Sequence, residues 1–216
     1  TSEIKAVSLK KLFDKEVDER SPRDNFFHCL VNAAHQFHRR EKNGDRYILA
    51  GYPWFKCRAR DTFIALPGLT LSIEEDDYFE LVMKTAMKGY YEFMEGKPVS
   101  VHIAEIEQPD VPLWAIWALQ QYAKETSKEE CFKKYGQFIK DVISFIQGNK
   151  HPNLKLEENG LLYTDGKDKA VTWMNSTANG HPVIPRTGYI VEVNALWYNA
   201  LRFVEDLVRE GGNDIF

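Results

Sequence analysis

The sequence predicts an all-α fold that carries one small β-hairpin region. Hydrophobic residues recur at spacings of three and four in one segment after another, which is typical of amphipathic helices. Glycine, proline and Asn-Gly pairs separate these segments. Residues 154–172 lack this helical pattern. Here Asn-Gly and Asp-Gly lie between short apolar runs and indicate hairpin turns. With 216 residues, 44% of them hydrophobic, the chain is long enough to bury the core of one domain.

The N-terminal part of the chain divides near residue 20. Residues 1–20 contain a charged amphipathic stretch that we expect to be a helical lead-in, and residues 21–216 form the main domain. A helix is predicted to start at Ser21-Pro22-Arg23-Asp24, because proline suits an early helical position, and to end at Asn43-Gly44-Asp45. A short apolar strand over residues 47–50 follows.

The remaining helices are delimited by breakers. The first runs from about Asp61 to Ser72, and Pro67 is expected to kink it or to end it early. The others are predicted over residues 76–95, 111–125, 128–147 and 191–209. Successive antiparallel helices of this kind build a bundle, a solenoid or a toroid of helical hairpins.

Composition excludes several classes of partner. A net charge of −4 provides no electrostatic attraction to nucleic acid or to an anionic membrane. The sequence contains no run of 18 or more apolar residues, so no transmembrane helix is predicted. Three widely spaced cysteines form neither a disulfide framework nor a zinc pattern, which favours a reducing, cytoplasmic location; Cys29 and Cys131 are expected in the core. His35 and His38 share a face of the predicted helix without a carboxylate or cysteine at ligand spacing, so no metal site is expected.

The segment over residues 50–69 carries the clearest functional signal. Tyr52 and Trp54 precede the charged neighbours Arg60 and Asp61, and an apolar helical run follows. Aromatic rings can stack on the C–H faces of a sugar, while Arg and Asp can make fork-like hydrogen bonds to vicinal hydroxyls. The same residues also fit a simpler interpretation, in which Trp54 belongs to the core and Asp61 caps a helix.

Two further segments combine tryptophans with charged residues. In residues 108–119, Asp110 precedes a helix that contains Trp114 and Trp117, and from these residues alone a helix cap above a tryptophan core is the better explanation. The third segment is Thr172-Trp173-Met174-Asn175, followed by Pro182-Val183-Ile184-Pro185-Arg186 and by the run from Val191 to Leu201.

Together these three segments resemble the amylo-α-1,6-glucosidase domain of the glycogen debranching family. The resemblance spans residues 50–201. It implies an (α/α)6 toroid of six helical hairpins and hydrolysis, with inversion, of α-1,6-linked glucose on a glycogen-like glucan. It also implies that Arg60, Asp61 and Asp110 bind sugar hydroxyls and that Trp54, Trp114 and Trp173 wall the sugar. Arg186 and Glu192 would then order the catalytic centre, and no cofactor or metal is implied.

The sequence departs from the family pattern at Asn175. The resemblance implies an aspartate here as the general acid, and an amide has no acidic proton to give to the leaving oxygen. Three interpretations follow: Glu192 or Asp110 donates the proton instead, hydrolysis has been lost while sugar binding is kept, or the acid lies at another position.

Twelve helices with loops need about 350 residues or more, whereas this chain supplies six or seven. We therefore expect only part of a toroid, without the family's general base, and inactivity of the isolated chain. A missing half or self-association of two copies would cover its apolar faces. The alternative function is a non-catalytic α-glucan-binding module on the same scaffold.

Overall fold

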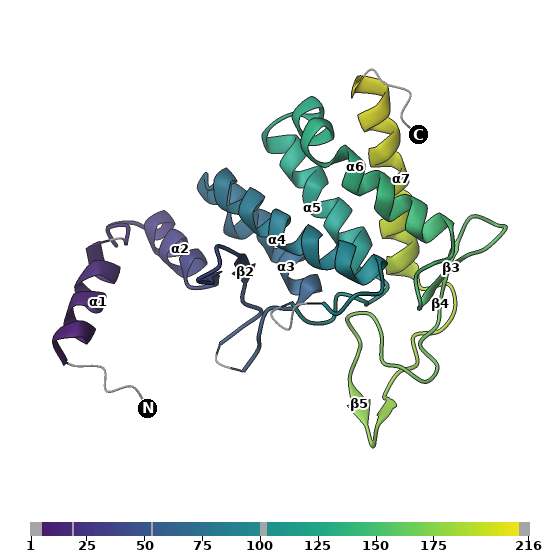
Figure 1. The fold of residues 1–216 in the computed structure, drawn as a ribbon, viewed down its shortest axis with the longest axis horizontal. Helices are drawn as coiled ribbons and strands as arrows, with labels where there is room; N and C mark the ends of the chain where they lie inside the picture. The colour runs from purple at the N-terminus through teal and green to yellow at the C-terminus, as the bar shows by residue number, and fades with distance from the viewer. Residues whose placement is uncertain (1–5, 19, 53, 100–102, 212–216) are drawn as a thin grey trace.

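The computed structural model describes residues 6–18, 20–52, 54–99 and 103–211, which form the helical architecture in Figure 1. The main body consists of α3 (Ala59–Leu69), α4 (Asp76–Met94), α5 (Val111–Glu125), α6 (Lys128–Gln147) and α7 (Val191–Gly211). A short 3-10 helix, η1 (Leu71–Ile73), links α3 to α4. The all-α prediction is confirmed, since the described strands form only small two-stranded sheets.

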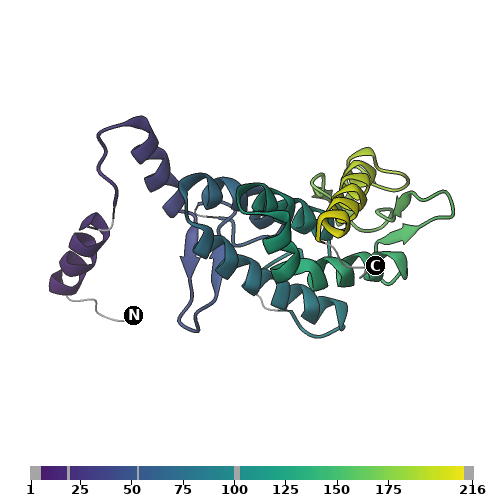
Figure 2. The same cartoon turned by 90° about the horizontal axis from the view of Figure 1, so that it is seen from above.

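Helices α3, α5 and α7 form one layer, in which α5 packs against both of the others. Helix α6 packs on α5 and α7, and α4 lies beside α3. From α3 to α7, successive helices run in opposite directions, as in a series of helical hairpins (Figures 1 and 2). The core between them is aromatic and aliphatic, with fully buried Phe63, Phe79, Tyr90, Tyr122 and Phe138. The toroid suggested by the sequence remains a prediction.

The boundaries of α5 and α6 agree with the sequence prediction, but α3 begins earlier. Arg58 has extended backbone and is the N-cap residue, so the helix starts at Ala59 and holds Arg60 and Asp61 in its first turn. Asp61 is therefore not the cap. Pro67 lies inside the helix, which continues to Leu69 instead of ending early.

The N-terminal elements differ most from the prediction. Helix α1 (Ala6–Asp18) lies apart from the main body (Figure 1), and α2 (Phe26–His35) starts after the N-cap Asn25. The predicted second helix is too long at both ends. Its last residues instead form β1 (His38–Arg40), which pairs antiparallel with β2 (Arg46–Ile48). The physical reason is Gly44, whose positive φ of 95° lets the chain reverse.

A side-chain prediction in α2 also fails. Cys29 is exposed, whereas Cys131 is buried in α6 as expected. The spacing of apolar residues shows which of them share a helix face, but not whether another element covers that face. Helix α2 makes a short contact with α3, and much of its apolar surface is exposed.

Between α6 and α7 the chain forms two hairpins. β3 (Leu154–Leu156) pairs with β4 (Leu162–Thr164) around Gly160, as predicted within residues 154–172. A second hairpin, β5 (Thr177–Ala178) with β6 (His181–Pro182), was not predicted, although Asn179-Gly180 supplies the two positive φ angles of its turn.

The Asp165-Gly166 pair is not a hairpin turn. Its glycine serves close packing instead, because a Cβ at Gly166 would lie 2.7 Å from the carbonyl oxygen of Arg186. Among the described residues, no helix has the length and the hydropathy needed to cross a membrane.

Candidate functional site

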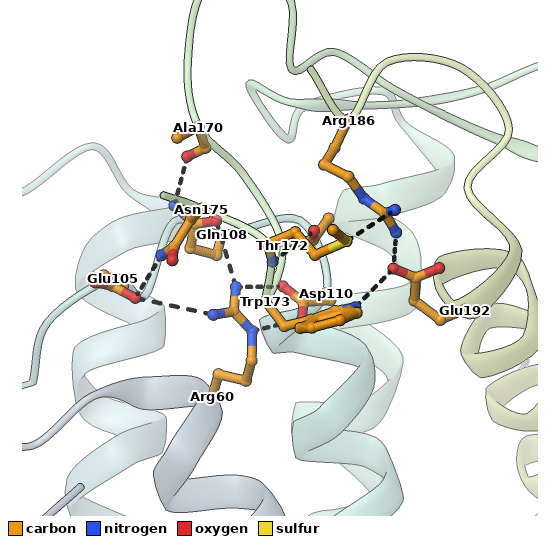
Figure 3. Close-up of polar contacts among 11 residues, drawn as sticks. Arg60, Glu105, Gln108, Asp110, Ala170, Thr172, Trp173, Asn175, Arg186 and Glu192 are labelled. Atoms are coloured by element: carbon orange, nitrogen blue, oxygen red, sulfur yellow. Dashed lines mark hydrogen bonds and ion pairs between the residues drawn. The ribbon is translucent and has the colours of Figure 1, made fainter. Parts of the chain in front are cut away.

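The N-termini of α3, α5 and α7 meet at one end of the helical layer and present polar side chains there (Figure 3). Arg60 comes from the first turn of α3, Asp110 is the N-cap residue of α5, and Glu192 comes from the first turn of α7. The loop that contains Thr172, Trp173 and Asn175 crosses above them in the same view. The structure thus gathers residues from all three sequence segments.

Arg60 and Asp110 form a buried, two-point ion pair. Arg60 Nε donates to Asp110 Oδ2 at 2.6 Å, and the terminal nitrogen Nη2 donates to Oδ1 at 2.9 Å. Arg60 is only 7% exposed and Asp110 only 2%. The Asp110 side chain makes no helix-cap hydrogen bond, so the capping interpretation of this residue does not hold. The guanidinium fork that the sequence assigned to sugar hydroxyls is used by Asp110, and Arg60 does not pair with Asp61.

Two residues that sequence reasoning missed complete this cluster. Gln108 Oε1 accepts from Arg60 Nη2 at 3.4 Å, and Glu105 lies 3.9 Å from Arg60 Nη1 and 3.5 Å from Arg58 Nε. The chain before α5 is held against the start of α3, because Ala59 N donates to Ala104 O at 2.9 Å. Glu105 also has a positive φ of 61°, which is uncommon outside glycine and asparagine. No helical or strand periodicity marks this loop, so its polarity was the only available signal.

Asn175 contacts the same cluster. Its Nδ2 donates to Glu105 Oε2 at 3.3 Å, and the residue is half-buried. Glu105 is thus the carboxylate in contact with residue 175, the residue that the resemblance identifies with the general acid. The amide itself can donate or accept hydrogen bonds, but it supplies no proton to a leaving group.

A second group of contacts surrounds Glu192. Its Oε1 accepts from Trp173 Nε1 at 3.1 Å and pairs with Arg186. Arg186 Nη1 also contacts Met174 Sδ at 3.4 Å. Trp173 is 62% exposed, and the hydrogen bond to Glu192 holds its indole at the N–H edge (Figure 3). An exposed ring with a fixed edge is a suitable stacking surface for a sugar.

The other residues predicted for the site are placed differently. Trp54 is 82% exposed and therefore does not belong to the core. The Asp61 carboxylate has no hydrogen-bond or ion-pair partner within the described part of the chain. Trp114 is half-buried in the first turn of α5, where its ring packs edge-on against Trp117 and against the core. Within the described part of the chain, no side-chain hydrogen bond, ion pair or ring contact joins Trp54 or Trp114 to the two clusters.

The arrangement is suited to binding neutral polyols. Asp110, Glu105 and Glu192 each lie beside a guanidinium, and carboxylates in such pairs accept charge-assisted hydrogen bonds. The larger described cleft, of about 890 Å³, lies elsewhere: it runs between α4 and α6 and is lined by Leu81, Met87 and Tyr91 among others. We place the candidate site at the three helix N-termini because side chains from distant segments converge there.

Comparison with known proteins gives one result. The family model described as amylo-alpha-1,6-glucosidase matches residues 31–214. Neither the curated proteins nor the solved structures contain a significant match. The matched range includes α3 to α7, both clusters of the site and the second half of α2.

Proposed function

Because this chain belongs to the amylo-alpha-1,6-glucosidase family, we propose that its site binds a glucose unit at an α-1,6 branch of a glycogen-like α-glucan. The observation that carries the proposal is Trp173, an exposed indole whose edge is held by Glu192 beside the buried Arg60–Asp110 pair. Such a site combines a stacking surface with charged hydrogen-bonding groups, which is what recognition of a sugar requires.

The contacts suggest a role for each group. Trp173 stacks on the glucose ring, and Glu192 and Arg186 bind hydroxyls at its rim. Asp61, which has no protein partner among the described residues, accepts from a further hydroxyl. Arg60 and Asp110 position the N-termini of α3 and α5 and line the bottom of the site. Trp54, if the loop before α3 closes over the sugar, adds a second aromatic wall.

We further propose that the wild-type chain by itself binds the glucan without releasing glucose. Hydrolysis with inversion needs a carboxylic acid that protonates the leaving oxygen and a second carboxylate that activates water. Asn175 cannot be this acid. Glu105, Asp110 and Glu192 lie beside arginines, and holding the proton that an acid must donate would weaken each of these pairs.

The same observation supports a second candidate function, a non-catalytic α-glucan-binding module on the glycosidase scaffold. In that case Asn175 is a binding residue, and restoring an acid at position 175 produces no turnover. The free cysteines of the described chain suit a reducing compartment, and we propose a cytoplasmic location for either function.

Binding is tested by calorimetry with a maltooligosaccharide that carries one α-1,6-linked glucose. Trp173→Ala is expected to weaken binding about two- to tenfold, which corresponds to about 0.5–1.5 kcal/mol of aromatic stacking. Phe26→Ala is the matched control, because Phe26 is also an exposed aromatic but lies at the start of α2. Equal effects of the two variants, or no binding by the wild type, would exclude a sugar site at Trp173.

Hydrolysis is tested by glucose release from a branched limit dextrin. Asn175→Asp would place a carboxyl group next to Glu105, where repulsion between like charges favours keeping a proton, as a general acid needs. We expect no glucose from the wild type. Release by this variant alone would show that Asn175 silences the site and that a second carboxylate of this chain activates the water. Binding without turnover in both forms would favour the binding module. Turnover by the wild type would show that another carboxyl donates the proton, and Glu105→Gln would then test Glu105 first.

A further inference from the structure

His35, His38 and Glu75 come together although they belong to three separate segments. His35 ends α2, His38 begins β1, and Glu75 is the N-cap residue of α4. One ligating atom from each of them lies within 4.8 Å of the other two. Sequence spacing concealed this group, because the carboxylate lies about 40 residues after the histidines and His38 is not in the helix.

Glu75 contacts both imidazoles at the same time. Its Oε1 lies 2.5 Å from His35 Nε2, and its Oε2 lies 3.6 Å from His38 Nδ1. The backbone of Glu75 is held by a hydrogen bond from its N–H to Thr70 O at 3.0 Å. The carboxylate is therefore positioned between the two rings.

His38 is held in the form that a metal needs. Its Nε2 donates to Leu69 O at 2.9 Å, so the lone pair of the neutral ring is on Nδ1, the nitrogen that faces Glu75. Ligating histidines commonly donate their other N–H to a carbonyl in this way. The ring also stacks on Tyr78 with a centroid distance of 3.9 Å.

We propose that His35, His38 and Glu75 form a binding site for a divalent transition-metal ion of the zinc type. Two imidazoles and one carboxylate form a ligand set that zinc accepts, with water in the fourth position. Tetrahedral zinc with bonds of about 2.0–2.2 Å separates its ligand atoms by about 3.3–3.5 Å. The gap from Glu75 Oε2 to His38 Nδ1 is 3.6 Å and is close to this spacing. The 2.5 Å gap from the other oxygen, Oε1, to His35 Nε2 would have to widen by about 1 Å on metal binding, which a side chain that is 35% exposed allows.

The surroundings favour the approach of a cation. A cleft of about 570 Å³ borders Glu75 and is lined by the four consecutive carboxylates of residues 74–77. Arg40 and Arg46 also line it and offset part of this charge. A bound ion would join the end of α2 and the start of β1 to the α3–α4 junction. Helix α2 otherwise has only a short contact with α3, so the metal would have a structural role.

The site is tested by titrating Zn²⁺ into chelator-treated protein in competition with a chromogenic chelator. We expect one ion per chain and at least tenfold weaker binding in His35→Ala and Glu75→Gln. Both substitutions are at partly exposed positions, and circular dichroism checks that each variant is folded. His28→Ala is the matched control, because His28 in α2 pairs with Asp24, which precedes the helix, and the described residues place no third ligand there.

Two further measurements distinguish specific coordination by these three residues from unspecific binding of metal ions at the surface. Co²⁺ should give the intense visible absorption of a tetrahedral ion in the wild type and in His28→Ala, but not in Glu75→Gln. Zn²⁺ should slow hydrogen exchange in α2. Absence of a stoichiometric ion, equal weakening by His28→Ala and His35→Ala, or equal affinity for Mg²⁺ would overturn the proposal. None of these readouts depends on sugar binding or hydrolysis.

Discussion

Asp110 shows how the site is built at the scale of single residues. An aspartate directly before a helix is typical of an N-cap, and Asp110 does occupy that position in α5. Its carboxylate nevertheless turns to Arg60, which lies 50 residues earlier in the chain. The type and local position of this residue were predictable from the sequence. Its partner was not, because the pairing depends on how α3 and α5 pack against each other.

The Arg60–Asp110 pair leads to a prediction about stability. Asp110→Asn keeps the shape of the side chain but leaves the charge of Arg60 buried without compensation, and we expect a loss of about 3–5 kcal/mol in the free energy of unfolding. Urea unfolding measures it. Glu205→Gln is the control and should have hardly any effect, since Glu205 and its partner Arg202 are both more than half exposed. Equal midpoints for the two variants would argue against a buried pair.

At the scale of elements, helices with clear limits were predicted best. Helices α5 and α6 begin and end where the sequence indicates, because an acidic or serine residue precedes each and an apolar stripe runs through each. The end of α2 and the hairpin of β5 and β6 were missed. Strands of two or three residues are too short to show an alternating pattern of apolar and polar residues. They form because a turn and neighbouring segments hold them in place.

Gly166 gives a prediction at this scale, because it lets the loop after β4 pass close to the backbone of Arg186. Gly166→Ala would place a Cβ 2.7 Å from Arg186 O, and we expect about 1–3 kcal/mol of destabilisation together with weaker oligosaccharide binding. Gly68→Ala is the matched control. It lies in α3 with no atom within 4 Å of the added Cβ, so alanine should stabilise the helix by about 0.5–1 kcal/mol. The same sign for both changes in urea unfolding would contradict this account.

At the scale of the whole molecule, the buried core includes one histidine whose protonation opposes folding. His151 lies between α6 and β3, where its ring packs edge-on against Phe93 and Phe145. Burial, with a smaller contribution from Lys169, lowers the pKa of His151 from 6.5 to about 3. The unfolded chain therefore takes up a proton near pH 6.5, while the folded chain does not until about pH 3.

Stability should accordingly depend on pH. The contribution of His151 is complete above about pH 6.5 and falls by about 1.4 kcal/mol for each pH unit below it, down to about pH 3. Urea unfolding of the wild type and of His151→Gln at pH 7 and pH 5 measures this slope. We expect the variant to lose less stability than the wild type between the two values. Parallel losses would show that His151 does not titrate in this way.

Periodicity, capping residues and motifs are local properties of the chain, so they sufficed to predict the all-α class, the limits of the long helices and the family. They also pointed to most residues of the two clusters. Which side chains meet became clear from the packing: Arg60 with Asp110, Asn175 with Glu105, Trp173 with Glu192, and His35 with Glu75. These pairs are 19 to 70 residues apart, so helix packing and irregular loops, which leave no periodic signal in the sequence, bring them together.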